Sequence, residues 1–244
     1  MTIRRINLAT NPSFEVALSG VTAGGGATNT QSPAWAAAGT YSLQVSAAGA
    51  TGPSTAAYPW GLMGAMAKMG VVPGKTYTVS ATARLTAAQT GSLDANARRI
   101  SIGSMTPGGG TVYPWALSEE APNGAGVTRL SVTFTVPLDA TNMFARLMNG
   151  EGTSGSGGSV WWDAILIEEG DTLGTYFDGG TAAHDNVAHR WVGTANASAS
   201  EEYYALPTVL VEELEPSPAP SVGITVVALG VTPTVFNVWR VAAG

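Results

Sequence analysis

Apolar and polar residues alternate with a period of two in three stretches of the chain. In residues 76–85 (TYTVSATARL), every second position from Tyr77 to Leu85 is apolar, and the positions between them are Thr, Ser or Arg. Residues 129–136 (RLSVTFTV) and 41–45 (YSLQV) follow the same rule. Successive side chains of a β-strand point to opposite faces of the sheet, so this alternation predicts antiparallel strands with one face in a core.

A fourth stretch, residues 159–167 (SVWWDAILI), is apolar on both faces apart from Asp163. A strand of this kind is typical of the centre of a sheet, between two packed layers. A buried carboxylate without a partner is costly, so Asp163 is expected to have one.

Turn residues separate these predicted strands. Residues 22–30, 106–111 and 150–159 are rich in Gly, and the whole chain contains 31 Gly and 14 Pro. Short strands joined by such turns are typical of a sandwich or barrel and not of an alternating α/β fold. Residues 57–69 have weak helical character, because Pro and Gly interrupt them.

The composition changes near residue 206. Residues 206–221 (LPTVLVEELEPSPAPS) are acidic and then rich in Pro, which predicts a stiff, extended linker. Residues 222–244 contain two β-like stretches, too few to bury a core of their own. They are interpreted as the start of a further β domain, or as strands that pair with another chain.

Composition and charge exclude several classes of function. The net charge is −6, and the 11 Lys and Arg residues are scattered, so no nucleic-acid partner is expected. The absence of Cys excludes disulfides, Cys-based zinc sites and thiol catalysis. The longest run of apolar residues and Gly, residues 222–231, is far shorter than the roughly 20 residues that span a bilayer, so no membrane insertion is expected.

Four sequence motifs, in this order, resemble carbohydrate-binding modules of families four, nine and twenty-two. They are NLATNPSFE (residues 7–15), GTYSLQV (39–45), PGKTYTVS (73–80) and WWDAILIE (161–168). The resemblance covers roughly residues 6 to 170 and implies a jelly-roll β-sandwich. Where that family commonly has a Trp soon after the first motif, this chain has Gly20 and Val21.

Two further motifs resemble the segment that follows such a jelly roll in minor tail proteins of long-tailed bacteriophages, especially those of actinobacteria. They are TYFDGGT (175–181) and RWVGTANASAS (190–200); VFNVWRVA (235–242) is similar to the opening of the next domain in those proteins. The expected fold is therefore an all-β jelly-roll sandwich with a C-terminal β extension and a partial second β domain. The expected divisions are a jelly roll at 1–173, an aromatic-flanked tail hairpin at 174–205, the linker at 206–221 and the further β segment at 222–244.

The resemblance also implies a structural calcium ion. In the resembling modules, a Glu and an Asp hold calcium together with backbone carbonyls, and Glu15 and Asp163 occupy the matching positions. Calcium takes six to eight oxygen ligands in loose geometry, which suits such a site. The alternative is that Asp163 accepts hydrogen bonds from backbone amides or from Arg4 or Arg5, with Glu15 a solvated turn residue.

Aromatic residues in Gly- and Pro-rich surroundings are the candidates for sugar binding. The sequence Tyr-Pro-Trp occurs twice, and a further Trp follows a nearby Pro; the candidates are Trp35, Tyr58, Trp60, Tyr113 and Trp115. If these rings are exposed on loops, sugars can stack on them. The alternative is that they close the ends of the sandwich or form a subunit interface.

No catalytic site is expected. The only histidines, His184 and His189, are interpreted as residues of a polar loop. The adjacent pairs at 119–120 and 168–169 are both Glu-Glu, and side chains of neighbouring strand residues diverge, unlike the facing carboxylates of glycosidases.

The resemblance implies a structural minor tail protein, located at the virion tail tip and assembled in the host cytoplasm. Its expected partners are other tail-tip proteins and copies of itself, for example in a trimer, and it would touch host cell-wall glycans. The alternative is a carbohydrate-binding module of a polysaccharide- or cell-wall-degrading enzyme.

Overall fold

The computed structural model describes most of the first 204 residues and two short strands after them. The described ranges are 2–18, 21–24, 27–46, 55–58, 70–89, 97–105, 111–150, 158–204, 209–211 and 226–228. For residues 2, 22, 55–58, 105, 111–115, 209–211 and 226–228, only the backbone is described. This part of the chain contains β-strands and no helix, which confirms the predicted all-β class.

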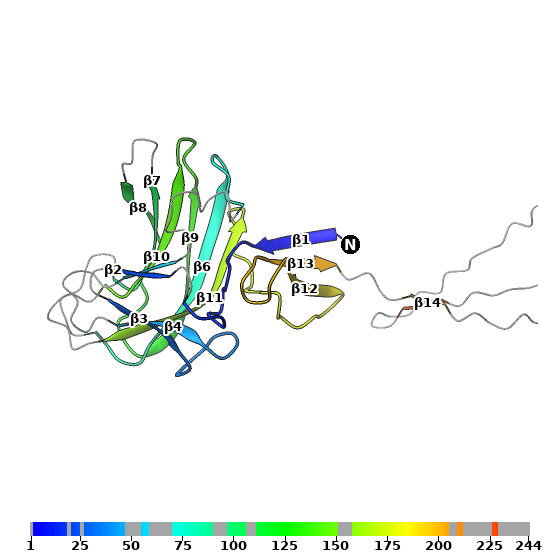
Figure 1. Ribbon diagram of the computed structural model, residues 1–244, viewed down its shortest axis with the longest axis horizontal. Helices are drawn as coiled ribbons and strands as arrows, with labels where there is room; N and C mark the ends of the chain where they lie inside the picture. The colour runs from blue at the N-terminus through cyan, green and yellow to red at the C-terminus, as the bar shows by residue number, and fades with distance from the viewer. Residues whose placement is uncertain are drawn as a thin grey trace, which may run out of the picture.

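Two five-stranded antiparallel sheets form the body of the molecule, a jelly-roll sandwich (Figure 1). The sheet named here the β11 sheet has the order β3 (Thr28–Ser32), β4 (Ser42–Ser46), β11 (Ser159–Glu169), β6 (Thr76–Leu85) and β9 (Gly126–Thr135). The β10 sheet has the order β2 (Thr22–Gly24), β5 (Thr55–Tyr58), β10 (Asn142–Met148), β7 (Ile100–Met105) and β8 (Thr111–Leu117).

The inward faces of the two sheets meet in one core. The three alternating stretches and residues 159–167 lie almost entirely in strands, and apart from Tyr41, which precedes β4 and is partly buried, the alternate apolar side chains of the three stretches are buried. Trp162, with no exposed surface, is the largest buried side chain in these four stretches, and Ile100, Ile102 and Leu147 face it from the β10 sheet. Alternation predicted these strands correctly because only one of their faces had to be apolar to form the core.

Strand β11 is central, as predicted, and it contains a bulge. Asp163 pairs with Thr82, and the next registered pair is Leu166 with Ser80, so Ala164 and Ile165 lie together opposite Ala81. Ala164 has a φ of 52°, in the left-handed region that non-glycine residues rarely adopt. The bulge turns backbone groups of β11 away from the ladder and toward the segment that follows β1.

Asn7 binds those backbone groups. Its amide nitrogen donates to the carbonyls of Ile165 and Phe177, both at 3.0 Å, and its amide oxygen accepts from the N–H groups of Ile167 (3.1 Å) and Ala9 (3.0 Å). Asn7 is fully buried. One side chain thus joins the N-terminal segment, the central strand and the tail.

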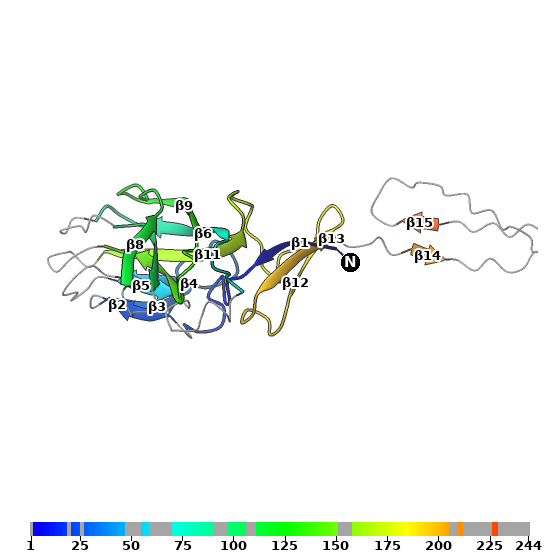
Figure 2. The ribbon, with the colours of Figure 1, turned by 90° about the horizontal axis from the view of Figure 1, so that it is seen from above.

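A third sheet, the tail sheet, has the order β1 (Thr2–Asn7), β13 (Ser200–Tyr204) and β12 (Val187–Trp191), as Figure 2 shows. Strand β1 pairs with the tail and with neither sandwich sheet, so the expected jelly-roll range 1–173 and tail range 174–205 share this sheet. Strand β14 (Val209–Val211), inside the expected linker, pairs with β15 (Val226–Ala228). The remainder of 206–244 lies outside the described residues.

Within the described part of the chain, no helix has the length and hydropathy needed to cross a membrane.

We expect Asn7→Ala to lower the free energy of unfolding by about 4 kcal/mol, because it leaves four buried backbone groups without their hydrogen-bond partner. Chemical denaturation of the full chain measures this. The matched control is Asn29→Ala: the Asn29 amide atoms are buried and have no hydrogen-bond partner among the described residues, so its removal should cost less than about 1 kcal/mol. Equal effects of the two substitutions would contradict the role assigned to Asn7.

Candidate functional site

Glu15 and Asp163 hold the same loop, residues 33–41. Asp163 Oδ2 accepts hydrogen bonds from the N–H groups of Ala37 (2.5 Å) and Ala38 (2.9 Å). Glu15 Oε1 accepts from the two N–H groups that follow, those of residues 40 and 41, at 2.7 and 2.8 Å. The two carboxylates therefore lie on either side of Gly39, although they are 148 positions apart in the sequence.

Gly39 makes this close approach possible. It has a φ of 72°, and a Cβ at this position would lie 2.4 Å from Glu15 Oε1. Any larger residue would be strained and would displace the carboxylate. The Gly in the GTYSLQV motif is thus required by the backbone conformation and by the neighbouring acid.

Asp163 is in an unfavourable position for a charge. It is fully buried, and its Oδ1 atom has no hydrogen-bond partner among the described residues. Burial raises the pKa of Asp163 from 3.8 to about 7; the backbone amides of Ala38, Ala164 and Ala37 oppose the shift, and the negative charge of Glu15 adds to it. The two acids are therefore close enough to interact electrostatically.

Asp163 accepts hydrogen bonds from backbone amides, one of the arrangements expected from the sequence, whereas Arg5 pairs with Glu168 and not with Asp163. Glu15 lies in the turn after β1, partly buried, and is bonded to the loop, so it is not a solvated turn residue. Two neighbouring acids, one with an unpartnered buried oxygen, fit a hard cation such as calcium. Among the described residues no third acidic or His side chain joins them, so the other ligands would be carbonyls or water.

The outer face of the β10 sheet carries an aromatic ring and a guanidinium group. Ala145 and Leu147 point into the core, so Phe144 and Arg146 lie on the opposite face, where Phe144 is only 7% exposed and Arg146 is partly exposed. Phe144 covers its cross-strand partner Gly103, where a Cβ would come within 2.1 Å of the ring. The Arg146 Cζ atom lies 5.0 Å from the centre of the Phe144 ring, within the range of a cation–π interaction.

Tyr58 and the second Tyr-Pro-Trp motif belong to this same sheet. Tyr58 is the last residue of β5 and pairs with Ala145, while Tyr113 and Trp115 lie in β8. In the sheet order β5-β10-β7-β8, these two strands stand on either side of the β10–β7 pair. Trp60 and the side chains of Tyr58, Tyr113 and Trp115 lie outside what the structure describes.

The loop location expected for Tyr113 and Trp115 is wrong, because both are strand residues. Pro114 does not prevent the strand, since β8 is at the edge of its sheet and the ladder is irregular between Val112 and Ala116. A Pro has no N–H to donate, and an edge strand or bulge tolerates this.

Trp35 is separated from the other aromatic candidates. It lies in the loop between β3 and β4, both strands of the β11 sheet. The Cζ atom of Arg84, on β6 of that sheet, is 5.9 Å from the centre of its ring. Trp35 therefore lies beside the β11 sheet, whereas Tyr58, Tyr113 and Trp115 belong to the β10 sheet.

The interpretation of His189 as a polar loop residue is wrong. It lies in β12, its side chain is 1% exposed, and its ring nitrogens face the Thr181 carbonyl (3.2 Å) and the Glu202 carboxylate (3.3 Å). His184 is exposed, as expected, and its ring stacks on the His189 ring, with 5.9 Å between the two ring centres. The alternation of apolar and polar residues gave no sign that His189 is buried, because the polar groups of Thr181 and Glu202 surround its ring only after the tail has folded.

The sequence analysis did not identify the Arg5–Glu168 ion pair. Arg5 donates from Nε (2.8 Å) and Nη2 (2.7 Å) to the two carboxylate oxygens of Glu168, which ties the tail sheet to β11. As expected, Glu169 diverges from Glu168, and it pairs with Lys75.

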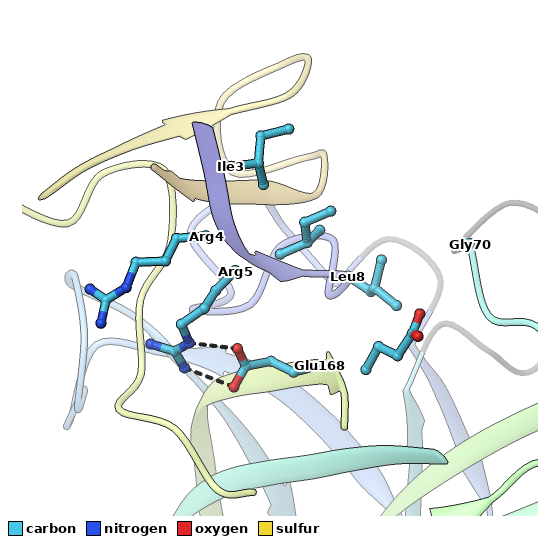
Figure 3. A pocket seen from close by; sticks show the side chains of 8 residues that line it. Ile3, Arg4, Arg5, Leu8, Gly70 and Glu168 are labelled. Atoms are coloured by element: carbon cyan, nitrogen blue, oxygen red, sulfur yellow. Dashed lines mark hydrogen bonds and ion pairs between the residues drawn. The ribbon is translucent and has the colours of Figure 1, made fainter. Parts of the chain in front are cut away.

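A pocket of about 440 Å³ lies between β1 and the end of β11, with the Arg5–Glu168 ion pair in its wall (Figure 3). It is lined by Ile3, Arg4, Arg5, Ile6, Leu8, Gly70, Glu168 and Glu169.

The chain belongs to the carbohydrate-binding domain family CBM_4_9, whose profile matches residues 6–145, more than half of its length. No curated protein matches it in sequence. Among solved structures, it is similar to the C-terminal family 22 carbohydrate-binding module of Clostridium thermocellum Xyn10B, with 22% identity, a TM-score of 0.46 and coverage of 66% of this chain and 94% of that chain.

Two further structures are similar at lower identity. One is the CBM22-1 xylan-binding domain of Paenibacillus barcinonensis Xyn10C, with 15% identity, a TM-score of 0.47 and coverage of 71% of this chain and 100% of that chain. The other is the enzymatically active domain of bacteriophage CBA120 tailspike protein 4, with 15% identity, a TM-score of 0.46 and coverage of 67% of this chain and 21% of that chain.

We expect the buried acid to make stability depend on pH. Because the pKa of Asp163 is higher in the folded state than in the unfolded state, protonation of this acid contributes to the free energy of unfolding, and the contribution is complete below about pH 4. As the pH rises toward 7, the contribution is lost, and the free energy of unfolding falls by at most about 4 kcal/mol. Denaturant unfolding between these pH values, in buffer with a chelator, should show a steeper loss of stability for the native chain than for Asp163→Asn. Equal slopes for the two proteins would contradict the assignment.

Proposed function

We propose that this chain is a structural minor tail protein of a bacteriophage tail tip, assembled in the host cytoplasm, that binds host cell-wall glycans. Membership of a carbohydrate-binding domain family supports binding in preference to catalysis. The observation that carries the glycan part is the outer face of the β10 sheet, where Phe144 and Arg146 lie on β10, in the same sheet as β8, the strand that contains the second Tyr-Pro-Trp motif.

This face has the chemistry that sugars require. The C–H faces of sugar rings stack on flat aromatic rings, and sugar hydroxyls accept hydrogen bonds from guanidinium groups. Gly103 leaves room for the Phe144 ring to lie flat on the sheet, and Arg146, partly exposed, extends from the same strand. A polysaccharide lying across β10 and β7 would contact the Arg146 guanidinium, and the Phe144 ring, of which 7% is exposed, would support that guanidinium from beneath.

The tail sheet supports the assembly part of the proposal. The aromatic residues of the phage-like motifs stabilise this sheet: Phe177 is 1% exposed, and Trp191 lies against Gly179, where a Cβ would be 2.4 Å from its ring. Strands β1 and β12 are the edges of the sheet, and open edges allow pairing across chains. Ile3 and Ile6 on β1 are 47% and 40% exposed, which suits an interface with other tail-tip proteins or with further copies in a homo-oligomer such as a trimer.

A structural calcium ion at Glu15 and Asp163 belongs to this proposal. The ion would supply positive charge between two acids that repel each other and would offset the cost of ionising Asp163. The chain's own contribution is the positioning of both carboxylates by backbone amides on either side of Gly39. Loop 33–41 would then be tied to β11 by the ion as well as by hydrogen bonds.

The first test is assembly of the full chain in solution. Sedimentation should give a multiple of the 24.8 kDa chain mass, and the double substitution of Ile3 and Ile6 to Glu should reduce it to the monomer, because it places charges in the interface. Leu138→Glu is the matched control: Leu138 is 84% exposed on the sandwich, and its substitution should leave assembly unchanged. A monomeric native chain that still binds glycans would overturn the tail-tip assignment in favour of a module of a polysaccharide- or cell-wall-degrading enzyme.

The second test is a glycan array with the full chain, in calcium and in a chelator. We expect binding to bacterial cell-wall polysaccharides, weakened about tenfold by Arg146→Ala and unchanged by Lys75→Ala, which removes a cation remote from the face. Chelation should lower both the glycan affinity and the thermal unfolding midpoint of the native chain. In Glu15→Gln, chelation should change neither quantity. Absence of binding to every glycan refutes the adhesive role, and a chelator effect that persists in Glu15→Gln refutes the calcium site.

A further inference from the structure

The outer face of the β11 sheet carries a row of side chains that the proposed function does not use. Trp161 on β11 pairs with Gln44 on β4 at one side and with Arg84 on β6 at the other, and Gln44 pairs in turn with Thr30 on β3. Cross-strand partners share a face of the sheet, so these four side chains lie side by side. Trp162, the next residue, points into the core, which places Trp161 on the outside.

The Trp161 ring is partly exposed and is fixed in position. Its indole N–H donates to Ser32 Oγ at 3.3 Å, on the same outer face. A fixed, flat ring loses little conformational freedom when a ligand stacks on it. The ring is therefore suited to a binding surface.

Among the described residues, Arg84 has no acidic partner. Its guanidinium donates to the Ala34 carbonyl at 3.4 Å and lies 5.9 Å from the centre of the Trp35 ring. Five other arginines are each paired with a Glu in the described part of the chain: Arg4, Arg5, Arg98, Arg99 and Arg190. In a chain with a net charge of −6, a guanidinium that no described carboxylate neutralises, close to the Trp35 ring and on the cross-strand neighbour of Trp161, is complementary to an anionic ligand.

Polar groups surround the aromatic pair. Gln44 Nε2 donates to Ser159 Oγ at 3.0 Å, and Ser46 and Ser159 share a hydrogen bond of 2.9 Å. Thr30 is exposed at the end of the row. Asp163, the next outward position on β11, is buried and bonded to the loop at residues 37 and 38, so its charge does not face the ligand. Amide and hydroxyl groups of this kind exchange hydrogen bonds with sugar hydroxyls.

We propose that Trp35, Trp161, Arg84 and Gln44 form a second glycan-binding site, specific for a polysaccharide strand whose sugars carry carboxylates. The sugar rings stack on the two indoles, and a sugar carboxylate binds the Arg84 guanidinium through two parallel hydrogen bonds. The site lies on the sheet opposite the Phe144–Arg146 face, so it stands independently of that face. With both sites active, one molecule binds two glycan strands, which increases avidity on a polysaccharide surface.

The test is calorimetric titration of the full chain with oligogalacturonate and with its methyl ester, which keeps the sugar ring and removes the charge. We expect Trp161→Ala and Arg84→Gln each to weaken oligogalacturonate binding about tenfold, and Arg84→Lys to retain more of it than Arg84→Gln. Val127→Ala, at an exposed position paired with Arg84 on β9, and Arg146→Ala, on the other sheet, should leave the affinity unchanged.

Several results would overturn this site. They are equal binding of the acid and its ester, native affinity in both Trp161→Ala and Arg84→Gln, and absence of oligogalacturonate binding. Trp161→Phe keeps an aromatic ring and should retain most of the affinity, which separates lost stacking from lost folding. Loss of oligogalacturonate binding in Arg146→Ala, with native affinity in Arg84→Gln, would assign the acidic glycan to the β10 face instead.

Discussion

The bulge in β11 is the constraint on which the rest of the structure depends. Where Ala164 and Ile165 stand opposite one residue of β6, backbone groups of the central strand leave the ladder and become available to other segments. Asn7 and the carbonyl of Pro12 take these groups, which fixes the course of the chain after β1. A regular strand would satisfy its own backbone within the sheet and would leave no docking point for the N-terminus or the tail.

The bulge also separates two buried acids on the same strand, each with its own kind of partner. Asp163, before it, holds loop 33–41 through backbone amides, and Glu168, after it, holds the tail sheet through Arg5. The partner of Glu168 is a guanidinium group, whereas the partners of Asp163 are backbone amides, and burial raises the pKa of Asp163 in spite of them. A positive charge beside such a buried acid would favour its ionised form.

The sandwich presents two outer faces with different chemistry. The β10 face combines Phe144 with Arg146, and the β11 face combines two indoles with Arg84. At the end of the β11 face away from Trp161, the Gly174 carbonyl accepts a hydrogen bond from Arg129 on β9. The tail sheet extends from one end of the sandwich (Figure 2).

The amino-acid sequence alone determined the strands whose one face is buried, because a buried face imposes a period of two that is visible locally. It also determined that β11 is central and that Asp163 needs a partner. It did not determine the pairing of β1 with β13, since this ladder pairs Thr2 with Tyr204, two residues far apart in the sequence. The interpretation of residues 159–167 as apolar on both faces correctly predicted burial of Leu166, but Trp161 remains partly exposed because no segment among the described residues covers that end of the sheet fully.

The resemblance in sequence predicted that Glu15 and Asp163 lie close together, and in the structure both bind loop 33–41, where a positive φ at Gly39 lets a single loop reach the two acids. The surroundings of Arg84 were not visible in the sequence, because Arg at an outward strand position is ordinary, and which described carboxylates lie near it is a property of the folded surface. Tertiary structure decided these points, since which charges are paired and which rings stay exposed depends on segments that meet only when the chain has folded.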